Sequence, residues 1–143
     1  MPEYSTRQAT DEDFETLFQI HRGAMKPHVE QIWGWNDDVQ KRRFRKRFGY
    51  GSTTQVVISE NHEIGYLRSG EESGEIFIAQ ISIAPGYQGR GIGTALIRDV
   101  LSHRRPVELG VFKINVRARR LYERLGFTVV GETETHHRMR WEP

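Results

Sequence analysis

The stretch from Ile76 to Thr94 places a hydrophobic strand, a proline, a glycine-dense turn and an apolar helix in direct succession. Gly89, Gly91 and Gly93 alternate where the chain turns into the helix. Glycine lets the backbone adopt positive φ and approach a ligand closely. The first N–H groups of a helix lack internal partners and lie at its positive end, which suits a phosphate. The turn favours phosphate binding, with close helix packing as the alternative.

Two common phosphate-binding motifs do not fit this turn. A dinucleotide fingerprint, Gly-x-Gly-x-x-Gly, counted from Gly89 would require glycine where the chain has Thr94. A P-loop requires a glycine followed by lysine and serine or threonine, but Gly91 is followed by Ile92 and Gly93. The phosphate site is therefore of another kind.

The composition limits the other classes. The chain has 143 residues, of which 36% are hydrophobic, and we expect one domain over residues 1–143. It has no cysteine, which excludes disulfides, thiolate metal sites and an acyl-cysteine intermediate. The N-terminus lacks a secretion signal and no apolar run could span a bilayer, so we expect a cytoplasmic protein that does not bind membranes. A net charge of +2 does not decide between a polyanionic small ligand and nucleic acid.

Hydrophobic periodicity predicts strands and helices in a mixed order. The expected strands cover residues 4–9, 53–59, 64–68, 76–83, 107–112, 127–130 and 136–141. The first expected helix begins at the cap Thr10, with Asp13 in its first turn, and ends between Gly23 and Pro27. The second begins after Asn36 and ends at Gly49 and Gly51. The third covers residues 91–103, and the fourth begins after Asn115 and ends at Gly126. In the strand 76–83, strict alternation assigns Phe77, Ala79, Ile81 and Ile83 to one face and Ile76, Ile78, Gln80 and Ser82 to the other. We expect an α/β (α+β mixed) domain with a mixed sheet and helices on both faces.

Two motifs resemble those of a known family. The segment from Ile81 to Ile97 closely resembles motif A of the GNAT superfamily of acyl-CoA-dependent N-acyltransferases. The segment from Asn115 to Phe127 is similar to motif B of the same family. The residues that carry the resemblance are Gln88, Gly91 and Gly93 in motif A and Asn115, Ala118, Leu121, Tyr122, Gly126 and Phe127 in motif B. The resemblance implies the GNAT fold, with a mostly antiparallel mixed sheet and splayed middle strands.

The resemblance also implies a set of site residues for acetyl-CoA, the acyl-donor cosubstrate. The expected ligand contacts are Ile81, Ser82 and Ile83 for the pantetheine arm, Gln88, Gly89, Arg90, Gly91, Ile92, Gly93 and Thr94 for the pyrophosphate, and Asn115 and Ala118 beside the pantetheine. Asn115 has helix capping as its alternative role. Tyr122 would lie near the thioester sulfur and donate a proton to the leaving thiolate, although its periodicity alone predicts a core aromatic residue.

The acceptor side is less defined by the sequence. The expected substrate-binding residues come from three places, namely the irregular segment 25–35, the strand 76–83 and the final hairpin. They are Met25, Glu30, Trp33, Trp35, Gln80 and His137. The tryptophans have core packing as an equal alternative. The strand 78–82 carries no acid, so the general base stays open among Glu30, Asp37, Asp38, Glu134, His136 and His137. Adjacent histidines on a strand point to opposite faces, and we expect no metal.

These observations predict an acetyl-CoA-dependent N-acetyltransferase that acts on a primary amine of a small molecule by direct transfer in a ternary complex. The alternatives are a protein or peptide N-acetyltransferase, an acyl-CoA-binding module without turnover, and a nucleic-acid-binding module based on the basic residues 41–47. The near balance of 21 basic and 19 acidic residues disfavours the last. A homodimer is an open alternative to a monomer.

Overall fold

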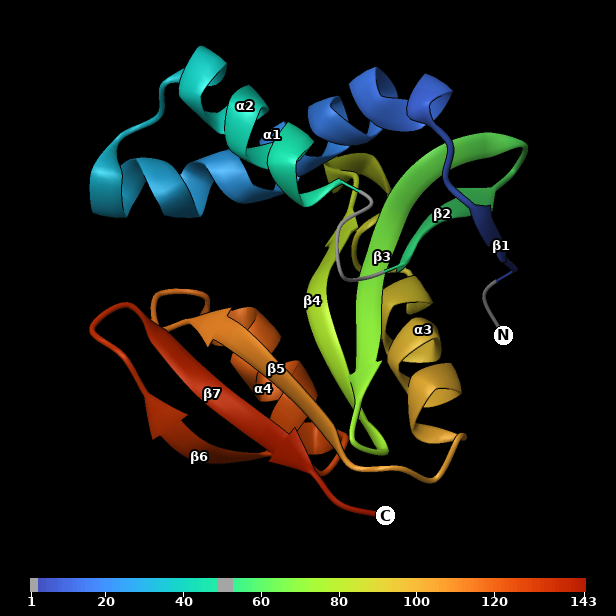
Figure 1. The fold of residues 1–143 in the computed structure, drawn as a ribbon, viewed down its shortest axis with the longest axis vertical. Coiled ribbons are helices and arrows are strands. Elements are labelled where there is room, and N and C mark those ends of the chain that lie inside the picture. Colours follow the sequence, from blue (N-terminus) through green and yellow to red (C-terminus); the bar gives the residue numbers. More distant parts are fainter. Residues whose placement is uncertain (1–2, 49–52) are drawn as a thin grey trace.

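A computed structural model describes residues 3–48 and 53–143 of the chain and shows a seven-stranded sheet with helices on both faces (Figure 1). The strands are β1 (Ser5–Gln8), β2 (Thr53–Ser59), β3 (His62–Glu72), β4 (Glu75–Ile83), β5 (Val107–Phe112), β6 (Thr128–Glu132) and β7 (His136–Trp141). The helices are α1 (Phe14–Trp33), α2 (Asp37–Arg47), α3 (Ile92–Leu101) and α4 (Val116–Arg124), with short 3-10 helices η1 (Asp11–Asp13) and η2 (Pro85–Tyr87). The mixed α/β class is confirmed.

The middle of the sheet is splayed. The strand order is β1-β2-β3-β4-β5-β7-β6; β4 and β5 run parallel and the other neighbours run antiparallel. The pairing of β4 with β5 covers Ile76 to Ile78, and beyond it the two strands diverge (Figure 1). Beyond Ile78, the β5-facing edge of β4 is therefore available to another hydrogen-bonding group.

A β-bulge at the start of the splay overturns the expected face assignment in β4. Gln80 pairs with Arg68 and Ile78 pairs with Ser69, which leaves Ala79 as the extra residue. A bulge shifts the alternation by one position. As a result, Ile76, Ile78 and Ile81 pack into the same hydrophobic cluster. Strict alternation across the whole strand was wrong for this reason.

Helix α1 is longer than expected. It continues through Gly23 and Pro27 to Trp33, so the segment 25–33 is helical and not irregular. Proline inside a helix removes one hydrogen bond and costs about 3 kcal/mol. Here the residues on both sides of it are held by burial, since Phe18 is fully buried and Val29 is 6% exposed. The long helix brings its second half over the site described below.

One predicted helix cap is present in the structure, and one strand is longer than predicted. Asn36 caps α2 as expected, with its Oδ1 accepting from Val39 N at 3.0 Å. The strand β3 extends through Gly70, where a Cβ atom would lie only 2.2 Å from the Phe77 ring. Gly49 and Gly51, at which we expected the second helix to end, lie outside the described residues.

The sheet separates two packed layers. Helices α1 and α2 cover one face, where Leu17, Phe18 and Phe44 pack with Val56 and Tyr66. Helices α3 and α4 cover the other face, where the core includes Ile92, Leu96, Ile97, Val107, Leu109, Tyr122, Phe127 and Met139. Within residues 3–48 and 53–143, no helix has both the length and the apolar character of a membrane span.

Candidate functional site

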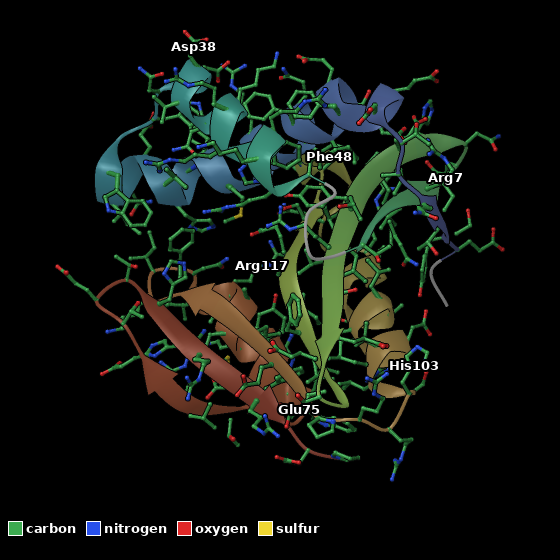
Figure 2. The ribbon with its side chains drawn as sticks, in the orientation of Figure 1. Arg7, Asp38, Phe48, Glu75, His103 and Arg117 are labelled. Atoms are coloured by element: carbon green, nitrogen blue, oxygen red, sulfur yellow. The ribbon has the colours of Figure 1, made fainter. Side chains whose placement is uncertain are left out.

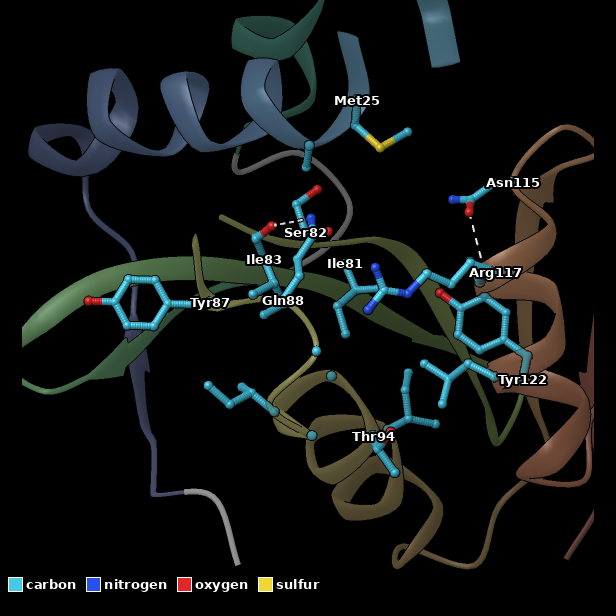
Figure 3. A pocket seen from close by; sticks show the side chains of 18 of the residues that line it. Met25, Ile81, Ser82, Ile83, Tyr87, Gln88, Thr94, Asn115, Arg117 and Tyr122 are labelled. Carbon is cyan, nitrogen blue, oxygen red and sulfur yellow. Dashed lines mark hydrogen bonds between the residues drawn. The ribbon is translucent and has the colours of Figure 1, made fainter. Parts of the chain in front are cut away.

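A cavity of about 510 Å³ lies where the open part of β4 meets α1, the start of α3 and the start of α4 (Figure 3). Thirteen of the predicted site residues line it. They are Met25, Ile81, Ser82, Ile83, Gln88, Gly89, Gly91, Ile92, Gly93, Thr94, Asn115, Ala118 and Tyr122. Residues that the sequence analysis assigned from two separate motifs therefore surround one space.

The glycine turn has the backbone geometry that an anion site requires. Gly89 and Gly91 have φ values of +78° and +84°. The Gln88 side chain donates to the Ile83 carbonyl at 2.9 Å, which ties the turn to the end of β4 (Figure 3). The first helical hydrogen bond of α3 runs from Ala95 N to Gly91 O at 3.0 Å, so the preceding amides are available to a ligand. These N–H groups lie at the positive end of the helix dipole.

Arg117 completes the positive side of the cavity and was missed by the sequence analysis. It stands in the first turn of α4, and its guanidinium points across the cavity (Figure 3). Its Nη2 atom lies 3.5 Å from the position that a Cβ atom on Gly89 would occupy. Arg124 also lines the cavity, and none of the described lining residues is acidic. The electrostatic environment thus favours an anionic ligand.

Arg90 lies outside this cavity, although the sequence analysis placed it with the turn. Its guanidinium stacks over the Tyr87 ring at 4.7 Å and donates to the Gly86 carbonyl at 3.2 Å. It also approaches Glu60, with 3.7 Å between Nη1 and Oε1. The side chain of Arg90 therefore stabilises the turn from the side that faces away from the cavity.

Tyr122 and Asn115 line the cavity from α4 and from its N-cap position. Tyr122 is 8% exposed, and burial raises the pKa of its phenol to about 12. Its hydroxyl is directed toward the cavity (Figure 3). Asn115 caps α4, with its Oδ1 accepting from Ala118 N at 3.2 Å, which is one of its two expected roles. Tyr122 thus keeps its proton at neutral pH and can donate it into the cavity.

A smaller cavity of about 130 Å³ lies beside the first, on the β5 and β7 side. Met25, Asn115, Ala118 and Tyr122 line both cavities, and Gln80 and His136 line the smaller one. The His136 ring lies 4.2 Å from the Phe112 ring, and its Nδ1 lies 2.8 Å from the Thr135 hydroxyl. Burial lowers the pKa of His136, which favours the neutral imidazole at pH 7.

Several predicted acceptor residues lie outside both cavities. Trp35 packs into the core between α1 and α2, and its Nε1 donates to Asp37 at 2.9 Å. Trp33 is 60% exposed and touches Phe112 edge-on, with 5.9 Å between the rings. The residues from the acceptor and base predictions that line neither cavity are Glu30, Trp33, Trp35, Asp37, Asp38, Glu134 and His137.

The residues of the larger cavity that the sequence analysis missed are Ala24, His28, Tyr87, Ile97, Arg117, Leu121 and Arg124. Ala24 and His28 of α1 line the larger cavity, and they were missed because the helix was expected to end between Gly23 and Pro27. The signal for Arg117 was its place two residues after the cap Asn115, where a long side chain can reach back past the helix start. In the described part of the chain, no group of three metal-ligating side chains comes together.

Comparisons with known proteins agree with this geometry. A family model described as "Acetyltransferase (GNAT) domain" matches residues 51–129. The N-acetylaspartate synthetase of Xenopus tropicalis is 34% identical over 93 residues, which are 60% of this chain and 34% of that protein. The spermine/spermidine N(1)-acetyltransferase of Bacillus subtilis is 29% identical over 90% of each chain. The chain spans between a third and a half of the length of the first curated relatives it matches.

Solved structures share the whole fold. The PaiA N-acetyltransferase of Thermoplasma acidophilum, solved in complex with coenzyme A, matches 99% of both chains with a TM-score of 0.80 and 16% identity. The ribosomal-protein-S18-alanine N-acetyltransferase of Escherichia coli matches 97% of this chain and 93% of that chain with a TM-score of 0.75 and 18% identity. The family match covers more than half of the residues and includes the glycine turn and α4. The chain belongs to the GNAT acetyltransferase family.

Proposed function

We propose that this protein transfers an acetyl group from acetyl-CoA to the primary amine of a small molecule. One observation carries the proposal: a single cavity has free helix amides and Arg117 at one end and the protonated hydroxyl of Tyr122 at the other. The first end suits a pyrophosphate, and the second suits a thiolate leaving group.

The residues present fit the donor. The turn from Gly89 to Thr94 would hold the pyrophosphate, because positive φ at the glycines turns several N–H groups toward one point. Arg117 would add a charged hydrogen bond to a phosphate oxygen. The main chain of Ile81 to Ile83 would pair with the pantetheine arm, since β5 has diverged from this part of β4.

The transfer needs a polarised carbonyl, a proton donor and a proton acceptor. The amine nitrogen attacks the thioester carbonyl and forms the new C–N bond, and the C–S bond then breaks. A main-chain N–H of the open part of β4 would stabilise the oxyanion. The Tyr122 hydroxyl would give its proton to the departing sulfur, and His136 would take the proton that the amine loses. His136 suits this role because it is neutral at pH 7 and lines the smaller cavity beside Tyr122.

The smaller cavity supports a small-molecule acceptor. Its volume of about 130 Å³ would hold a compact amine. Related proteins are named for acetylation of aspartate and of spermine or spermidine, so an amine acceptor is common to them. The basic helix α2 has intramolecular contacts that account for part of its charge, because Lys41 pairs with Glu15 at 2.7 Å and Arg45 stacks on Phe14.

The experiment that tests this function is a panel of primary amines with acetyl-CoA, followed by detection of the free thiol of CoA. We expect thiol release that depends on the amine and gives an N-acetylated product by mass spectrometry. Thiol release at the same rate without an amine would identify a hydrolase. An absence of both turnover and acetyl-CoA binding would refute the proposal.

A further inference from the structure

A buried arginine on the acceptor side of the sheet has no role in the chemistry above. Arg68 lies in β3 and is only 8% exposed. Its neighbour Tyr66 belongs to the cluster beneath α1 and α2, whereas Leu67 belongs to the cluster on the opposite face. Because side chains alternate along a strand, Arg68 points to the same side as Tyr66, under α1 and α2.

Arg68 has no compensating charge in the described part of the chain, where it makes no ion pair and donates no hydrogen bond. Burial lowers the pKa of Arg68, and the positive charge of Arg47 acts in the same direction. The same two arginines, after burial itself, help to lower the pKa of His21 to about 4, so His21 is neutral beside them. Residues 49–52 read Gly-Tyr-Gly-Ser and bring no carboxylate.

A largely buried guanidinium that no carboxylate among the described residues neutralises is unfavourable, so its retention indicates an anion that is supplied from outside the chain. Arg47 is exposed to solvent, but its positive charge also acts on Arg68 and adds to the positive potential there. Arg47 directly precedes Phe48, which packs against the cluster that contains Tyr66 and lies over β3 (Figure 2). The end of α2 thus brings a second positive charge to the side of the sheet on which Arg68 lies.

Gln80 connects Arg68 to the acceptor cavity. The two residues are directly opposite each other in the β3–β4 ladder, so their Cβ atoms lie about 4.5–5.5 Å apart on one face. Gln80 lines the smaller cavity, and its Nε2 lies 3.4 Å from the sulfur of Met25, which lines both cavities. Arg68 itself lines neither cavity, so an anionic group on a molecule in the smaller cavity would reach it by extending past Gln80.

The charges around the cavities exclude the opposite kind of substrate. Among the described residues, neither cavity is lined by an aspartate or a glutamate. A polyamine needs carboxylates to hold the ammonium groups that do not react. Arg68 and Arg47 would repel those groups instead.

We propose that the acceptor is a primary amine that also carries a carboxylate, and that Arg68 binds this carboxylate. The inference rests on the proposed acetyl transfer and specifies its substrate class. The planar guanidinium can bind both oxygens of a carboxylate, which fixes the orientation of the acceptor. Its amine is then placed in the smaller cavity, between Gln80 and Tyr122.

The first test compares amines that differ only in the carboxylate. Alanine is paired with ethylamine, phenylalanine with 2-phenylethylamine and 4-aminobutyrate with propylamine, and spermidine is included as a polyamine. The holoprotein with acetyl-CoA is expected to acetylate at least one amino carboxylate with a kcat/KM about tenfold or more above that of its partner. Equal or better turnover of the partner amines, or a preference for spermidine, would overturn the inference while leaving acetyl transfer intact.

The second test uses Arg68→Met, with Arg98→Met as the matched control. Arg98 is exposed on α3, on the other face of the sheet. In Arg68→Met, the ratio of kcat/KM between an amino carboxylate and its partner amine is expected to fall about tenfold or more, and the ratio in Arg98→Met to stay at the wild-type value. Because the ratio is taken within one protein sample, partial misfolding does not alter it. An unchanged ratio in Arg68→Met would overturn the inference.

If Arg68→Met does not fold, Arg68→Lys keeps the charge and loses the bidentate geometry, and the same ratio is expected to fall by a smaller factor. Coenzyme A affinity is measured for every variant. Loss of CoA binding and of all turnover in the wild-type protein would refute the proposed function itself, which separates that failure from a wrong substrate class.

Discussion

Arg117 and Gly89 lie side by side in the lining of the larger cavity, with the Arg117 Nη2 atom 3.5 Å from the position of a Cβ atom at residue 89. The two residues belong to different motifs and different elements, the glycine turn before α3 and the first turn of α4. Their proximity brings the backbone amides of the turn and a guanidinium together, and we propose that they bind one anion.

Replacement of Arg117 by methionine should weaken coenzyme A binding about tenfold, which corresponds to about 1.4 kcal/mol. The reason is the loss of a charge-assisted hydrogen bond to phosphate. Isothermal titration calorimetry measures the effect. Arg120→Met is the control, because Arg120 is an exposed arginine of α4 that does not line the cavity. Equal affinities for coenzyme A in the two variants would show that Arg117 does not bind the ligand.

Replacement of Gly89 by alanine should weaken coenzyme A binding and lower thermal stability together. The φ of +78° at residue 89 is strained for any residue with a Cβ atom, at a cost of about 1–2 kcal/mol. The new methyl group would lie in van der Waals contact with Arg117, 3.5 Å from its Nη2 atom. Gly86→Ala is the control, since Gly86 lies in the same connection, has no positive φ and has open space around its Cβ position. If Gly89→Ala binds coenzyme A like the wild type, the turn does not contact the ligand.

Tyr122→Phe should lower kcat about 100-fold or more, in line with the loss of a general acid. The KM for acetyl-CoA should change little, because the ring and its packing against Phe127 remain. Tyr4→Phe is the control, as it removes a phenol hydroxyl that bonds to Asp99 outside the cavity. Since the pKa of Tyr122 is about 12, ionisation of this phenol should not reduce kcat at pH 9. A fully active Tyr122→Phe would refute the proton-donor role.

The proton-acceptor role of His136 predicts a specific pH dependence. Burial lowers the pKa of this imidazole below its usual 6.5, so the neutral form that accepts a proton persists below that pH. The kcat should therefore fall only as the pH drops through this lowered pKa and the imidazole becomes charged. In His136→Gln, the fall of kcat at acidic pH should disappear, and most of the kcat at pH 7 should be lost. His137→Gln is the control, because His137 lies outside both cavities, and its kcat should show the same fall at acidic pH as the wild type.

The half of the site that binds the donor could be predicted because it depends on local sequence. A turn with alternating glycines before an apolar helix, and an asparagine at the start of the next helix, determine their own backbone geometry. The sequence pattern therefore identified Gly89, Gly91 and Asn115. The sequence could not show whether Arg90 or Arg117 faces the cavity, because the direction of a long side chain depends on its contacts in the fold. The guanidinium of Arg90 is held by Tyr87 and by Glu60, which is distant in the sequence.

The acceptor half could not be predicted because tertiary packing overrides its local signals. Gly23 and Pro27 indicated a helix end, yet burial of Phe18 and Val29 keeps α1 helical and brings Met25 and His28 to the cavity. The bulge at Ala79 has no proline or glycine to indicate it, and it changes the direction of every following side chain in β4. That Arg68 has no acidic partner among the described residues is visible only when its neighbours in the fold are known.

The most direct test of acyl-CoA binding is a calorimetric titration of the wild-type protein with acetyl-CoA, repeated with acetate as a ligand that lacks the CoA moiety. We predict one saturable site per chain for acetyl-CoA and no binding of acetate, since the turn amides and Arg117 recognise the phosphates. A flat acetyl-CoA titration of folded protein would contradict the assignment of the cavity and, with it, the proposed acetyl transfer.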